Sequence, residues 1–143
     1  MAVDSRQRKL NYGQIITMFL AANPQPHPPQ VMMAGILREL SMPQVKTIQF
    51  GNTVFEVIPG KDRVAFFKAF NADTAPNFVE NGRQFVVWAR HEMGLKKLVT
   101  QFQDPSLLQI FKVIEMNPPM PGMGYQTGKT KDGQTQVVLK LGD

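Results

Sequence analysis

Gly128-Lys129-Thr130 is the stretch of this sequence whose residue types most resemble a reaction centre, because a phosphate-binding loop ends in this way. Such a loop also needs a glycine five residues before its second glycine, so that backbone amides can cradle the phosphates. Position 123 is Met123. A strand should precede the loop and a helix should follow it, whereas prolines precede it and a hairpin is expected after it. The stretch predicts a basic loop.

Other chemistry-bearing residues are few. His91-Glu92 begins a zinc-protease helix motif, but the second histidine would fall at position 95, which is Leu95. The sequence has no cysteine and only two histidines. We therefore expect no catalytic residue, no metal and no cofactor, and we predict that the protein is not an enzyme.

Positive charge is the next signal. The 143 residues include 16 Lys and Arg against 11 Asp and Glu, a net charge of +5. Such an excess favours association with nucleic acid or acidic surfaces. Arg83, Arg90 and Lys97 recur every seven residues, so on one helix they would form a stripe with cations roughly 10 Å apart. The stripe either follows a phosphate backbone or simply solvates the helix.

Two further groups combine cations with a tyrosine. Arg6, Arg8 and Lys9 precede Tyr12, and Tyr125 precedes Lys129 and Lys131. An exposed aromatic ring beside cations suits single strands, because bases stack on the ring and phosphates attract charge. Tyr125 has an equally good alternative role, which is to pin its loop to the core.

The elements that position these residues predict a single α+β domain over residues 1–143. We expect four to five helices packed with antiparallel β-hairpins. A basic arm covers 1–11, the core covers 12–116, and a proline- and glycine-rich segment with a C-terminal hairpin covers 117–143. Proline-rich stretches at 23–29 and 117–124 should run extended, since proline fixes φ and lacks a backbone donor.

Local patterns place the helices at 12–22, at 29–40, from Asp62 to Phe70 and from 83 to 102, with another after Asp104-Pro105. Residue types also alternate over 110–116, so a strand is the alternative to a helix there. Residues 45–50 and 53–58 flank Gly51-Asn52 and predict a hairpin in which Phe50 opposes Thr53. Asp132-Gly133 predicts a second hairpin that leads into a strand at 136–141.

The chain resembles the single-stranded-DNA-binding transcription cofactors of phages that carry a giant virion RNA polymerase. The likeness lies in size, basic charge, methionine-rich helices and the lack of catalytic groups. It implies a viral accessory protein in the host cytoplasm.

We accordingly predict a non-enzymatic protein that binds nucleic acid, preferring single-stranded DNA, and that acts as a homo-oligomer. The alternative is a structural virion or assembly protein whose extended segments dock onto neighbouring subunits or other viral proteins. No apolar stretch reaches the ~20 residues that span a bilayer, so no membrane partner is expected.

Overall fold

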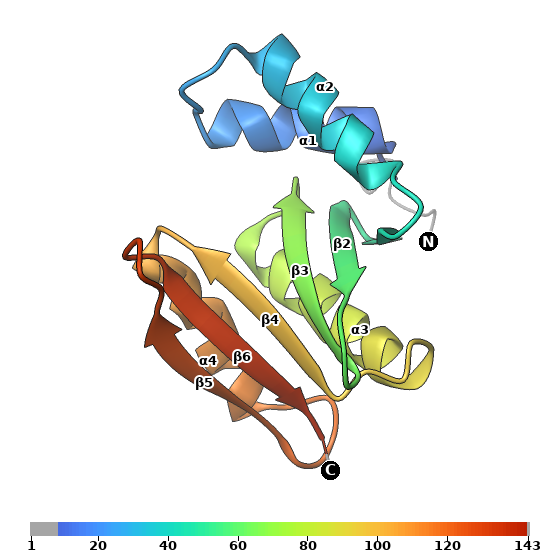
Figure 1. The fold of residues 1–143 in the computed structure, drawn as a ribbon, viewed down its shortest axis with the longest axis vertical. Helices are drawn as coiled ribbons and strands as arrows, with labels where there is room; N and C mark the ends of the chain where they lie inside the picture. The colour runs from blue at the N-terminus through green and yellow to red at the C-terminus, as the bar shows by residue number, and fades with distance from the viewer. Residues whose placement is uncertain (1–8, 143) are drawn as a thin grey trace, which may run out of the picture.

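A mixed six-stranded sheet with helices on both faces forms the protein (Figure 1), which confirms the predicted α+β class. The computed structural model describes residues 9–142. In chain order the elements are α1 (Tyr12–Ala22), α2 (Pro29–Leu40), β1 (Lys46–Phe50), β2 (Thr53–Pro59), β3 (Val64–Asn71), α3 (Ala75–His91), β4 (Lys97–Phe102), the 3₁₀ turn η2 (Pro105–Leu107), α4 (Leu108–Met116), β5 (Met123–Lys129) and β6 (Thr135–Leu141).

The strands are ordered β1-β2-β3-β4-β6-β5. Strands β3 and β4 run parallel and are connected by α3, while the other neighbouring pairs are antiparallel. Helices α3 and α4 lie behind the sheet in Figure 1, and α1 and α2 cross over the upper end of β2 and β3. The parallel pair is therefore the place where the topology changes, at the centre of the sheet.

Each face of the sheet has its own core, because successive side chains of a strand point to opposite faces. Phe55 and Phe67 pack with Phe85 of α3 in the larger core. Val54 and Phe70 pack on the other face against α1 and α2. At the start of α1, Asn11 and Gln14 make a reciprocal capping box, which fixes where this covering helix begins.

The hairpin of β1 and β2 confirms the predicted register: Phe50 is opposite Thr53, Ile48 is opposite Phe55, and Lys46 is opposite Val57. The hairpin of β5 and β6 is also confirmed. Residues 108–116 are the helix α4, not a strand. Strand β6 lies between β4 and β5, so both of its edges are paired within the sheet.

The predicted helix from Asp62 to Phe70 is wrong, because this segment is a tight turn followed by β3. Asp62 and Arg63 have φ of 59° and 60°, in the left-handed region of a turn. Strand β3 has apolar residues on both faces, since Phe67 faces α3 and Phe70 faces α1. Apolar residues on both faces remove the alternation of a half-buried strand, and the remaining pattern imitates a helix.

The predicted helix from 83 to 102 is also wrong in its second half. Helix α3 ends at His91, and Gly94 follows with φ of 67°, the left-handed conformation that commonly stops a helix. The chain then turns into β4. In the part of the chain that the structure describes, no helix is long and apolar enough to cross a membrane.

Candidate active site

Strands β3 and β4 meet at one end and separate at the other. Their pairing covers Val64 to Phe66 on β3 and Lys97 to Val99 on β4. Beyond Phe66 and Val99 the two strands diverge, so their facing backbone groups have no strand partner within the described chain. Unpaired N–H and C=O groups at a strand edge are ready to bind an extended ligand.

A cavity of about 720 Å³ occupies this divergence. Lys68 and Phe70 line it from the α1 face of β3, whereas Phe67 and Ala69 line it from the α3 face. Its walls extend to α1 on one side and to α3 and α4 on the other. The cavity therefore passes through the sheet at the gap between the parallel strands.

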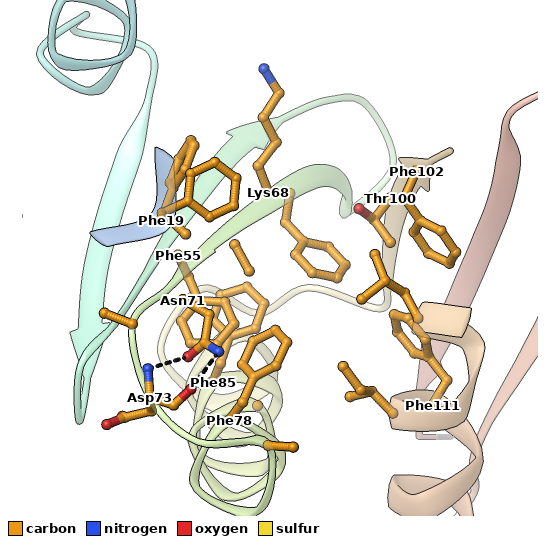
Figure 2. A pocket seen from close by; sticks show the side chains of 18 of the residues that line it. Phe19, Phe55, Lys68, Asn71, Asp73, Phe78, Phe85, Thr100, Phe102 and Phe111 are labelled. Atoms are coloured by element: carbon orange, nitrogen blue, oxygen red, sulfur yellow. Dashed lines mark hydrogen bonds between the residues drawn. The ribbon is translucent and has the colours of Figure 1, made fainter. Parts of the chain in front are cut away.

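Aromatic side chains make up much of the cavity wall, and they come from both faces of the sheet (Figure 2). Phe55 and Phe85 are stacked with ring centroids 4.1 Å apart, and Phe102 and Phe111 are stacked at 6.2 Å. Phe78 projects from α3 toward the same space. Such a lining favours an apolar or amphipathic ligand.

The start of α3 borders the cavity through Asp73 and Ala75. The first N–H groups of a helix have no intrahelical partner and attract anions. Thr74, at the N-cap, makes no side-chain hydrogen bond to them, and Pro76 removes one of them. This end of the cavity thus offers some backbone donors, in a loop that contains no glycine.

A polar network holds the loop between β3 and α3 in place. Asp73 Oδ2 accepts hydrogen bonds from the backbone N–H of Asn52 at 2.8 Å and from Asn81 Nδ2 at 2.7 Å. The Asp73 N–H donates to Asn71 Oδ1 at 3.0 Å (Figure 2). The tip of the β1–β2 hairpin and the first turns of α3 are therefore fastened to the same carboxylate.

Glu56 lies opposite Lys68 in the register of β2 and β3, next to the cavity rim. Its side chain is fully buried, and neither carboxylate oxygen has a hydrogen-bond partner in the described chain. Burial, and then the nearby Glu39 carboxylate, raise the pKa of Glu56 to about 7, while Lys68 acts in the opposite direction. Lys68 Nζ binds Glu39 at 3.2 Å.

The predicted cationic stripe does not lie on one helix. Arg83 and Arg90 lie on α3, but Lys97 is the first residue of β4. The Arg83 guanidinium turns toward α4, where it donates to the Val113 carbonyl at 3.3 Å. The seven-residue spacing has no helical meaning once the helix ends at His91.

The other predicted contacts lie ahead of α1 and on the β5–β6 hairpin. Arg6 and Arg8 lie outside the described residues, and Lys9 is exposed ahead of α1. Tyr125 packs against Phe111 with ring centroids 6.0 Å apart, and burial raises the pKa of Tyr125. Lys129 donates to Thr135 Oγ1 at 3.3 Å, and Lys131 is exposed in the β5–β6 turn. Tyr125 thus fits the anchoring alternative.

Among residues 9–142, no three His, Cys, Asp or Glu side chains are grouped so that they could hold a metal ion. The cavity also went unnoticed in the sequence. Its aromatic residues come from distant segments, and the signals that would have located it are the strand at 64–71 and the stop at Gly94, both of which we read as helix.

Comparison with solved structures connects this arrangement with acetyltransferases. A variant of the spermidine N-acetyltransferase SpeG from Vibrio cholerae superposes with a TM-score of 0.59 at 8% identity, over 93% of this chain and 92% of that one. AAC(6')-Ib, in complex with paromomycin and acetyl-CoA, gives a TM-score of 0.56 at 14% identity, over 92% and 90% of the two chains. The N-acetyltransferase PseH from Campylobacter jejuni gives 0.56 at 13%, over 92% of each.

No protein-family model and no curated protein matches the sequence. The chain therefore shares a fold with these acetyltransferases across nearly its whole length. This likeness overturns our prediction of a non-enzymatic, DNA-binding viral protein, since the similar structures are enzymes that transfer acetyl groups.

Proposed function

We propose that the protein is an N-acyltransferase that takes an acyl group, in the simplest case acetyl, from a coenzyme A thioester. The observation that carries this proposal is the aromatic cavity between the diverging parallel strands, which runs to the start of α3. The acetyltransferase fold supports the same class of reaction.

The residues present fit the arm of such a thioester. That arm is an extended chain with two amide groups, and it needs apolar walls and backbone partners. The unpaired edges of β3 beyond Phe66 and of β4 beyond Val99 supply donors and acceptors, and the rings around them supply the walls. When bound, the thioester supplies an activated acyl carbon.

The diphosphate end would lie at the start of α3. The backbone N–H groups of Thr74, Ala75 and Asn77 are the available donors, because Pro76 has none. Asp73 brings a negative charge to this loop, although two hydrogen bonds already engage its Oδ2. We expect the arm to contribute more to affinity than the phosphates.

The cluster of Glu56, Glu39 and Lys68 accepts the proton that the attacking amine loses. A general base works best when its pKa is near the working pH, and that of Glu56 is raised to about 7. Lys68 lines the cavity whereas Glu56 lies behind it, so the proton reaches this cluster through water. Transfer should therefore speed up as the pH rises through about 7.

The test is release of free thiol from acetyl-CoA in the presence of a panel of primary amines, followed from pH 5.5 to 9. We expect amine-dependent release that increases through about pH 7. Glu56→Gln should lower kcat on the order of 10²-fold and flatten the pH profile. Glu115→Gln, which removes an exposed carboxylate of α4, is the matched control.

Failure of the folded protein to bind coenzyme A, together with no thiol release from any amine in the panel, would show that the proposed function is wrong.

A further inference from the structure

The half of the cavity that lies against α1 is built for an apolar group. Met18, Phe19 and Ala22 of α1 line it together with Phe70 of β3. Phe19 and Phe70 meet edge to face, with ring centroids 5.2 Å apart. Met18 is 47% exposed, so the mouth of this half opens beside α1. This is the side of the sheet on which Glu56 and Lys68 lie.

No carboxylate lines this half of the cavity. Lys68, Asn23 and Gln101 are its polar lining residues. Asp73 lines the cavity near α3, and its Oδ2 is already engaged by two donors. Glu39 does not line the cavity and binds Lys68. A ligand with several positive charges would meet an ammonium group and no row of carboxylates, which is unfavourable.

We infer that the acceptor is a primary amine on an aromatic or aliphatic body with no second positive charge, seated against the wall that the Phe19 and Phe70 rings form. This inference rests on the proposed function. It separates the chain from the similar structures whose titles name spermidine and paromomycin, both of which carry several amines. The ring pair supplies apolar and edge-to-face contacts, while the amine points toward the gap in the sheet.

The transfer step balances with these groups. The amine nitrogen forms a bond to the acyl carbon, the carbon–sulfur bond of the thioester breaks, and the sulfur leaves as a thiolate, which takes up a proton from water. One amine proton passes to the cluster of Glu56, Glu39 and Lys68. The products are an amide and free coenzyme A.

Isothermal titration of the full chain, with and without coenzyme A, tests the acceptor class. The probes are 2-phenylethylamine, spermidine and paromomycin. We expect 2-phenylethylamine to bind at least tenfold more tightly than either polyamine. Phe19→Ala should weaken the binding of 2-phenylethylamine at least fivefold. If the alanine variant unfolds, Phe19→Leu, which keeps an apolar side chain, is measured in its place and should retain most of the affinity. Lys68→Glu should strengthen spermidine binding at least fivefold.

The outcomes separate the two proposals. Spermidine binding as tightly as 2-phenylethylamine overturns the acceptor class. If coenzyme A binds and 2-phenylethylamine does not, the acceptor class is wrong and the proposed function stands. If 2-phenylethylamine binds and coenzyme A does not, the apolar amine site stands and the proposed function is wrong.

Discussion

Glu56 is a buried acid on a strand that otherwise carries apolar residues toward α1 and α2. An unpartnered carboxyl in such a place is tolerated mainly in its neutral form, which is why its pKa rises. Folding therefore favours the protonated group. Its contribution to stability is complete below about pH 4.5 and is lost as the pH rises through about 7.

The stability of a Glu56→Gln variant should therefore depend on pH differently from that of the wild type. The two proteins should have equal free energies of unfolding near pH 4.5, and above pH 7 that of the variant should be higher by on the order of 1–3 kcal/mol. Urea unfolding at pH 4.5, 6 and 8 measures the difference. Glu115→Gln, on the exposed side of α4, controls for the loss of one charge. A difference that does not grow with pH would contradict the assigned burial.

Gly51 gives the second residue-scale prediction. It has φ of 55°, and a Cβ there would lie 2.6 Å from Asn81 Oδ1 and 2.9 Å from Asp73 Oδ2. Gly51→Ala should therefore cost about 1–3 kcal/mol of unfolding free energy through backbone strain and disruption of the Asp73 network. Gly128→Ala, where a Cβ meets nothing within 4 Å, should change stability by less than about 1 kcal/mol. Equal effects of the two substitutions would argue against the network.

At the scale of elements, the sequence predicts structure well where one local rule decides it. Gly51-Asn52 specifies a hairpin whose predicted register agrees with the structure, and Pro29 correctly marks the start of α2. The errors occur where the local pattern of residue types does not identify the element. Strand β3 is apolar on both faces, and β4 follows α3 after a short turn at Gly94.

The candidate site depends on those two misread strands. Its walls require β3 and β4 to be parallel neighbours, a relationship between residues about thirty positions apart that no local spacing reveals. The basic residues, by contrast, are easily noticed in a sequence, but the structure scatters Arg83, Lys97 and Lys129 over α3, β4 and β5.

Pro76 lies in the first turn of α3 and removes one backbone N–H there. Pro76→Ala restores one N–H in its first turn and should leave the helix intact. If phosphates bind there, coenzyme A should bind about two- to tenfold more tightly, because the variant offers one more hydrogen bond. Pantetheine, which has the arm of coenzyme A without the diphosphate, should bind with unchanged affinity. Titration calorimetry with both ligands distinguishes the cases. A parallel change for pantetheine, or none for coenzyme A, would place the phosphates elsewhere.

At the scale of the whole molecule, the sheet and its two helical layers surround a cavity that no single element could form. Residues of α1 line the gap between β3 and β4 from one face of the sheet, and residues of α3 and α4 line it from the other. Figure 1 shows α3 and α4 behind the sheet. A thioester and an amine could thus approach from opposite faces and meet within the sheet. We propose that the gap itself binds the thioester.

Calorimetry with acetyl-CoA on a variant whose gap is filled by a larger side chain tests whether the thioester binds there. Thr100 lines the cavity and is paired with Val137 of β6, and Thr127 of β5 is paired with the same Val137 but lies outside the cavity. We predict that the wild type and Thr127→Leu bind acetyl-CoA in calorimetry with equal affinity, and that Thr100→Leu, still folded by circular dichroism, binds at least tenfold more weakly. Full affinity in folded Thr100→Leu, or no binding by the wild type, would contradict the account.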